Sequence, residues 1–259
     1  MTTTGLKEQR CDRSSSDSHI RSLPMLDIAD RERIESLLPE ALVREALSLE
    51  GRACITNSFQ AEDMMVLHLL RQIDPEIPVL FLDTGYHFAE TYAYRDRIAK
   101  DWNLNLISLR AEQSVASQEG AFGILNRSDP TRCCALRKVE PLMRGLADYD
   151  IWFTGLRRDQ SPTRKNLRKV EHHALPSGKT LLKVSPLAAM DSKQVWNYIA
   201  RHEIEYLSLY DEGYASIGCE PCTSIPGDKN NPRSGRWSGQ KLECGIHTFT
   251  EINSFQEVR

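Results

Sequence analysis

Apolar residues along this chain form two patterns, short continuous runs and longer stretches with helical spacing. Continuous runs are typical of strands buried on both faces of a sheet, whereas apolar residues three and four positions apart predict helices with one buried face. The runs predict strands at 53–59, 77–85, 105–109, 150–155 and 181–187. The spaced stretches predict helices at 27–50 with a break near Pro39, and at 61–70, 88–102, 132–146 and 191–202. In the last helix, Asp191 is the expected N-cap, and Val195, Trp196 and Ile199 are expected to face inward.

Strands and helices alternate in this order, which predicts an α/β fold with a parallel doubly wound sheet. In such sheets, ligands bind at the carboxyl ends of the strands. Three predicted strands end in polar or glycine-containing loops, at 58–60, at 83–85 and at 155–164, and the third loop is basic. The first loop leads directly into a helix, whose N-terminus favours anions. This loop has no glycine, so it is equally consistent with an ordinary helix start.

Composition places the chain among ordinary globular proteins. It has 259 residues, 40% hydrophobic and 27% charged, with a formal net charge of −3 and a pI of about 6.2. This charge argues against a nucleic-acid or membrane surface as the main partner. We expect a disordered N-terminal tail at 1–24, a nucleotide-binding domain at 25–224 and a flexible C-terminal segment at 225–259. The sequence does not indicate an oligomeric state.

Seven cysteines carry the most specific chemical signal. An odd number, without an apparent export signal, indicates reduced thiols and a cytoplasmic protein. Cys133 and Cys134 are adjacent, and Cys219 and Cys222 form a C-x-x-C motif. Four thiolates in two close pairs suit either a structural zinc ion or an iron–sulfur cluster. Cys244 stands apart from both pairs, and we expect it to have a different role.

The remaining candidates have simpler interpretations. Cys11 is expected to be an incidental exposed thiol, and Cys54 a small buried apolar residue. The pair Arg137 and Lys138 follows the adjacent cysteines by four residues, so it could offset the charge of a cluster or form a solvated basic face. His87 is expected to be a cap or surface residue.

Histidines elsewhere in the chain are given structural roles. His172 and His173, in a polar stretch, are expected at the surface. His247 lies three residues after Cys244 and could tune that thiol, but a structural role is preferred.

Three motifs together resemble the assimilatory adenylyl-sulfate (APS) reductases. They are C-C-A-L-R-K at 133–138, G-C-E-P-C at 218–222 and E-C-G-I-H at 243–247. Further similarity lies in F-L-D-T-G-Y-H-F-A-E-T-Y at 81–92, T-G-L-R-R-D-Q-S at 154–161 and P-R-S-G-R-W at 232–237. The resemblance covers residues from about 50 to 248 and leaves out the long polar N-terminus.

This resemblance implies a fold of the adenine-nucleotide alpha-hydrolase (ATP pyrophosphatase-like) type, with a mobile C-terminal tail. It implies reduction of adenosine 5′-phosphosulfate (APS) to sulfite and AMP through a cysteine S-sulfonate, within sulfate assimilation and cysteine biosynthesis. It further implies thioredoxin as the electron donor and a [4Fe-4S] cluster as the cofactor. Relatives without the four paired cysteines prefer the 3′-phosphorylated substrate, PAPS, so their presence favours APS.

The resemblance also assigns roles to individual residues. Cys244 would be the nucleophile. The cluster would be held by Cys133, Cys134, Cys219 and Cys222. The adenosine would lie against Leu82 and Asp83, near Ser58 and Gly155, and the phosphosulfate would be bound by Lys138, Arg164, Arg233 and Arg236. Two alternatives remain open, a PAPS or dual-substrate reductase and a non-catalytic nucleotide-binding protein with a zinc ion on the four cysteines.

Overall fold

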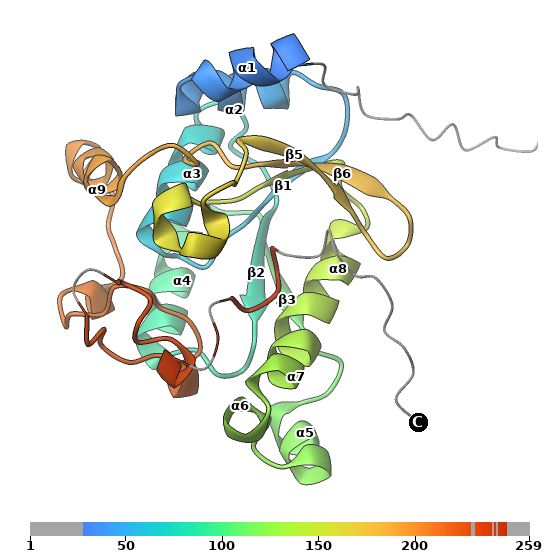
Figure 1. Cartoon of the computed structure of the whole chain (residues 1–259), viewed down its shortest axis with the longest axis vertical. Coiled ribbons are helices and arrows are strands. Elements are labelled where there is room, and N and C mark those ends of the chain that lie inside the picture. The colour runs from blue at the N-terminus through green and yellow to red at the C-terminus, as the bar shows by residue number, and fades with distance from the viewer. Residues whose placement is uncertain (1–27, 229–230, 240, 242, 248–259) are drawn as a thin grey trace, which may run out of the picture.

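The computed structural model describes residues 28–228, 231–239, 241 and 243–247 (Figure 1). Cys11 and the predicted tail at 1–24 lie outside the described residues. The strands are β1 (Ala53–Thr56), β2 (Val79–Asp83), β3 (Leu106–Arg110), β4 (Ile151–Phe153), β5 (Val170–Ala174) and β6 (Thr180–Val184). The helices are α1 (Ile28–Ser36), α2 (Pro39–Leu47), α3 (Ala61–Arg71), α4 (Ala89–Asp101), α5 (Val115–Phe122), α6 (Leu125–Ser128), α7 (Pro130–Cys134), α8 (Glu140–Leu146) and α9 (Ser192–Arg201). A π-helix, η1 (Ala135–Val139), joins α7 to α8.

The six strands form one sheet in the order β3-β2-β1-β4-β6-β5. All neighbouring strands are parallel except the edge pair β5 and β6. The predicted parallel α/β sheet is therefore confirmed. Strand β5 was missed, because its residues Val170–Ala174 include a glutamate and two histidines instead of an apolar run. The surface position expected for His173 is wrong, since this residue is only 1% exposed and packs edge-on against Trp152.

Side chains alternate between two apolar layers on opposite faces of the sheet, as the period of two in a strand requires. Ile55, Val79 and Phe153 belong to the layer that includes residues of α2, α3, α4 and α9. Cys54, Leu80 and Trp152 belong to the other layer, with residues of α8. Figure 1 shows α3, α4 and α9 on one side of the sheet and α8 on the other. Cys54 is fully buried, as expected for a small apolar residue.

Local signals explain the most regular of these helices. Asp191 caps α9 through a reciprocal pair of hydrogen bonds with Gln194, and Val195 and Ile199 are buried. The predicted N-cap and inward face of this helix are confirmed. Pro39 begins α2, where its missing N–H costs nothing.

The C-terminal segment returns to the carboxyl edge of the sheet. Figure 1 shows it in red, beside β2 and β3. Trp237 in this segment is 4% exposed and packs with Cys134, Cys219 and Cys222. None of the helices in the described part of the chain is long and apolar enough to cross a membrane.

Candidate active site

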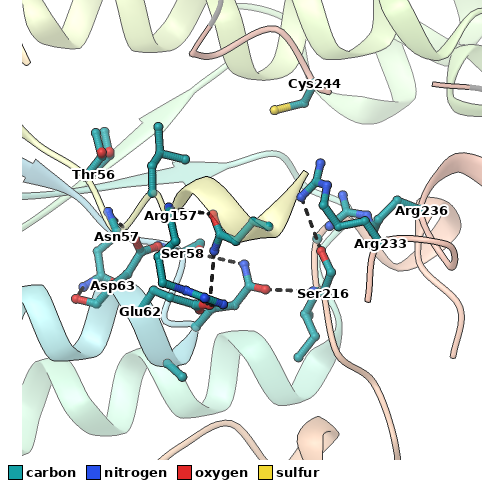
Figure 2. A pocket seen from close by; sticks show the side chains of 18 of the residues that line it. Thr56, Asn57, Ser58, Glu62, Asp63, Arg157, Ser216, Arg233, Arg236 and Cys244 are labelled. Carbon is teal, nitrogen blue, oxygen red and sulfur yellow. Dashed lines mark hydrogen bonds and ion pairs between the residues drawn. The ribbon is translucent and has the colours of Figure 1, made fainter. Parts of the chain in front are cut away.

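A cavity of about 540 Å³ lies at the carboxyl edge of the sheet. It opens between the neighbouring strands β1 and β4. The strands that pair with β1 and β4 on their other edges, β2 and β6, extend the sheet in opposite directions from this point. Doubly wound sheets bind ligands at such a position. Its walls come from the segments after β1, β2 and β4, from η1 and from the C-terminal segment. Figure 2 shows Cys244 on the opposite side of this cavity from Asn57 and Asp63.

The loop after β1 is held by an acidic residue that the sequence analysis missed. Asp63, on the first turn of α3, accepts hydrogen bonds from the N–H of Ser58 at 2.8 Å and from its hydroxyl at 2.6 Å. It also accepts one from the N–H of Gly155 at 3.2 Å, so a single carboxylate links the ends of β1 and β4. Burial raises the pKa of Asp63 to about 6, against the effect of these donors. The loop itself is tightly turned, with Phe59 in the left-handed region at φ 61°.

This loop differs from an ordinary capped helix start. The N-cap of α3 is Gln60, whose side chain does not cap the helix. Its Oε1 instead accepts a hydrogen bond from the N–H of Ile217 at 2.8 Å, and the N–H of Ala61 donates to the Tyr210 hydroxyl at 3.3 Å. The loop therefore joins the sheet to the chain segment that precedes the C-x-x-C motif.

Basic side chains surround one side of the cavity. Lys138, Arg164, Arg233 and Arg236 all line it, although they come from η1, from the loop after β4 and from the C-terminal segment. Arg236 is 5% exposed and stacks over Trp237, with its guanidinium carbon 4.5 Å from the ring centroid. Arg233 donates to the Ser216 hydroxyl at 3.5 Å (Figure 2). Such a concentration of positive charge suits an anion with several oxygens.

The paired cysteines line a second, smaller cavity. Cys133, Cys134, Cys219 and Cys222 are all buried there, together with Thr84, Lys138 and Trp237. The Thr84 hydroxyl lies 3.2 Å from the Cys219 sulfur. In the described ranges, no group of three or more His, Cys, Asp and Glu side chains is arranged to hold a metal ion in its present position. The structure thus brings together, at one cavity, two cysteine pairs that are far apart in the sequence.

The π-helix directs two basic residues inward beside these cysteines. Arg137 and Lys138 are only 5% and 9% exposed, which excludes the solvated basic face considered from the sequence. Arg137 donates to the Thr84 carbonyl and to the Gln118 side chain. Burial alone would lower the pKa of Lys138, but negative charge on the sulfurs of Cys219, Cys244 and Cys134 raises it above its ordinary value. Lys138 and Trp237 each line both cavities, so they form the wall that the two cavities share.

Several further side chains complete the cavity. His87 lines it and donates from Nε2 to the Leu82 carbonyl at 2.8 Å, and burial lowers its pKa to about 4. The surface or cap role expected for His87 therefore does not describe its position. His247 also lines the cavity and stacks on Trp152, with ring centroids 5.6 Å apart and planes at 16°.

The catalytic and substrate-binding candidates from the sequence fall into two groups. Seven line the larger cavity with Cys244: Ser58, Leu82, Lys138, Gly155, Arg164, Arg233 and Arg236. Asp83 is not among the described residues that line this cavity, and its carboxylate accepts hydrogen bonds from Tyr92 at 2.8 Å and Arg110 at 2.9 Å. Sequence reasoning missed Asp63 and His87, whose only local signals were an acid on a first helical turn and a histidine after a strand.

Comparisons with known proteins agree with this geometry. The phosphoadenosine phosphosulfate reductase domain matches residues 52–225. The adenosine 5′-phosphosulfate reductase of Rhodococcus opacus is 48% identical over 72% of this chain and 75% of that protein. The phosphoadenosine 5′-phosphosulfate reductase of Gloeobacter violaceus is 42% identical over 82% of this chain and 90% of that protein.

Solved structures agree in fold. The phosphoadenylyl-sulfate reductase of Candida auris, in a phosphate complex, matches with a TM-score of 0.64 and 24% identity over 77% of this chain and 98% of that one. The FMN adenylyltransferase of Candida glabrata matches with a TM-score of 0.54 and 13% identity over 78% of this chain and 67% of that one. These likenesses confirm the predicted nucleotide alpha-hydrolase-like fold. The matched domain and the identities to curated relatives show that this chain belongs to the phosphoadenosine phosphosulfate reductase family.

Proposed function

We propose that this chain reduces adenosine 5′-phosphosulfate to sulfite and AMP, with Cys244 as the nucleophile. The observation that carries the proposal is a single cavity containing Cys244 together with Lys138, Arg164, Arg233 and Arg236. A thiol that lines the same cavity as four cations suits attack on a sulfur atom bonded to anionic oxygens. Several similar proteins are named adenosine 5′-phosphosulfate reductase, which supports this substrate.

The reaction divides into two nucleophilic steps. The Cys244 thiolate attacks the sulfate sulfur, the bond from sulfur to the bridging phosphate oxygen breaks, and AMP leaves with that electron pair. The product is a cysteine S-sulfonate. A thiolate of a dithiol donor, which we propose to be thioredoxin, then attacks the cysteine sulfur and releases sulfite. The second donor thiol resolves the mixed disulfide, so the donor supplies both electrons and becomes a disulfide.

The cations of the cavity offset the repulsion between thiolate and substrate. Each negative oxygen of the phosphosulfate needs a donor that is in place before the reaction, because reorganising water would raise the barrier. Lys138 is held by burial between the two cavities, and Arg236 by its contact with Trp237. We assign Leu82, Ser58 and Gly155 to the nucleoside side of the cavity and keep Asp83 as a neighbouring residue of that site.

The four paired cysteines fit a [4Fe-4S] cluster as a donor set. Soft thiolates are the ligands that iron–sulfur clusters take, and all four cysteines line one buried cavity. When bound, the cluster would supply a fixed negative charge and a covalent connection between α7 and the C-x-x-C segment. The buried Lys138 ammonium would offset that charge. A zinc ion on the same thiols is the competing interpretation, and it would give a colourless protein.

The sulfite formed would serve sulfate assimilation and cysteine biosynthesis in the cytoplasm. A second candidate substrate is PAPS, which is favoured by the similarity to the Gloeobacter violaceus protein. The two substrates differ by a 3′-phosphate, so they are distinguished by kinetics.

The decisive experiment measures sulfite release from APS and from PAPS in parallel, with thioredoxin as the reductant. Without reductant, APS should add about 80 Da, one SO3 group, to the peptide containing Cys244, and thioredoxin should remove it. Cys244→Ser should keep the visible absorbance and bind AMP normally, but lose turnover. An adduct on another cysteine, or near-normal turnover in Cys244→Ser, would refute the proposed nucleophile.

A further inference from the structure

Glu243, the residue before the proposed nucleophile, is surrounded by hydrogen-bond donors. Arg164 donates to the Glu243 carboxylate from Nε at 2.9 Å and from Nη2 at 2.8 Å. The Thr163 hydroxyl donates to Oε1 at 2.9 Å, and Arg233 donates to Oε2 at 3.4 Å. These contacts connect the C-terminal segment to the loop after β4.

This ion pair is protected from solvent. The side chains of Glu243 and Arg164 are each 12% exposed, whereas those of the surface pair Arg97 and Glu205 are more than half exposed. Burial alone would raise the pKa of Glu243, but the hydrogen bond and charge of Arg164, with the charge of Arg233, lower it. Exposed ion pairs contribute little, but a bidentate, largely buried pair is a strong and directional contact.

Arg164 serves two sides at once. Its Nε and Nη2 hold Glu243, while its Nη1 donates to the Gln160 side chain, which lines the cavity. The guanidinium therefore holds the C-terminal segment through Nε and Nη2, and it contacts another residue of the cavity wall through Nη1. The cavity of about 540 Å³ is present while Glu243 is bound, with Cys244 in its lining.

We propose that Glu243 is a positioning residue that anchors the C-terminal segment so that Cys244 faces the substrate. The inference rests on the proposed function, because it deepens the role of the same site. Arg164 and Arg233 then contact both the anchor and the substrate, which couples binding to correct placement of the thiol. Release of this anchor exposes Cys244 to the dithiol donor.

The opposite role is a pseudo-substrate. A carboxylate bound to two arginines could compete with the phosphosulfate for them, in which case its removal would tighten substrate binding and speed the reaction. The two roles predict opposite changes in the rate of sulfur transfer.

The test uses two variants of the full-length protein with its cluster content matched to wild type. Glu243→Gln removes the charge with little change in shape, and Thr163→Val removes one donor without changing the charge beside Cys244. Glu112→Gln is the control, because Glu112 forms an exposed pair with Arg144 in which the two side chains are 78% and 46% exposed.

Three quantities are measured for each protein. The first is the rate of Cys244 alkylation by iodoacetamide, followed by peptide mass, which reports opening and requires no APS. The second is the Kd for AMP. The third is the single-turnover rate of adduct formation from APS, measured without reductant.

For Glu243→Gln we expect alkylation about 10-fold faster and adduct formation about 10-fold slower, because a strong charged contact has been lost. The Kd for AMP should change less than about threefold. Thr163→Val should shift both rates in the same directions by a smaller factor, and Glu112→Gln should match wild type. Faster alkylation in both variants excludes altered thiol acidity as the cause.

Unchanged alkylation in both variants would overturn the anchor, and so would faster adduct formation in Glu243→Gln, which would indicate the pseudo-substrate. A rise in the Kd for AMP that accounts for the whole loss of rate would show that Glu243 acts on binding and would equally overturn the proposal. If wild-type protein forms no adduct at all, the proposed function fails, while alkylation still tests the anchor.

Discussion

Gly155→Ala tests the contact between the two halves of the sheet. An added Cβ would lie 2.4 Å from Oδ1 of Asp63, 2.9 Å from its backbone nitrogen and 2.9 Å from the carbonyl carbon of Glu62. The carboxylate can rotate away only by giving up the N–H of Gly155, and the backbone of α3 cannot retreat without moving the whole helix. Gly155 shows no left-handed φ, so the expected effect is steric and not conformational.

The magnitude follows from two costs. Overpacking a rigid interior costs about 1–3 kcal/mol. Losing a hydrogen bond to a buried carboxylate costs about 1.5–3 kcal/mol. Together they predict a loss of about 3–6 kcal/mol in the free energy of unfolding, a large part of the total stability of an ordinary domain. Binding of AMP should weaken as well, because Ser58 and Gly155 both line the cavity.

Urea unfolding monitored by circular dichroism, under anaerobic conditions, measures the first effect, and calorimetry with AMP measures the second. Gly120→Ala is the matched control, since its added Cβ meets nothing within 4 Å on helix α5. That change should stabilise the protein by up to about 1 kcal/mol. In the double variant Gly155→Ala with Asp63→Ala, the two losses should sum to less than their separate values. Stability within about 0.5 kcal/mol of wild type for Gly155→Ala, with normal AMP binding, would refute the reasoning.

Three further predictions concern neighbouring features. Gly218→Ala should lower kcat/KM for APS by at least about 10-fold without loss of fold. The added Cβ would lie 2.1 Å from Nη2 of Arg236 and would displace that guanidinium. Unchanged kinetics would contradict this contact. Burial raises the pKa of Asp63 to about 6, so the folded state favours the protonated carboxyl. The free energy of unfolding that this carboxyl contributes therefore falls as pH rises from about 4 to about 6. Relative to Asp63→Asn, wild type should therefore lose about 1 kcal/mol of unfolding free energy between pH 5 and pH 7, measured by urea titration, and a flat difference would argue against the shift. His247→Ala should move tryptophan emission to longer wavelength, because it uncovers the ring of Trp152, and an unchanged spectrum would show that this stacking is absent in solution.

Local sequence patterns predicted most of the fold because buried parallel strands are continuous apolar runs. They failed at β5, where pairing with β6 buries His173 although the segment reads as polar. The π-helix was also missed, since its direction depends on what Arg137 and Lys138 contact across the molecule.

The candidate site shows the same division. The cysteine pairs and the basic residues could be named from motifs, and the structure places them at two adjoining cavities. The contact of Glu243 with Arg164 and the bridge made by Asp63 could not be named, because each joins segments about 80 or more positions apart with no local signal.

The position of the cavity between β1 and β4 has a consequence for how the chain folds. Strands β1, β2 and β3 are consecutive in the sequence, and β2 pairs with both of the others, whereas β4 pairs with β1 across about 100 residues. Contacts between distant segments carry a larger loop-closure cost, so the pairing of β1 with β4 is expected to form late and to open early. A nucleotide bound across this junction would stabilise it by mass action. A ligand in the proposed substrate site would then stabilise the strand pairing that is most distant in the sequence. Backbone amides of β4 would gain more protection from hydrogen exchange when AMP binds than those of β3.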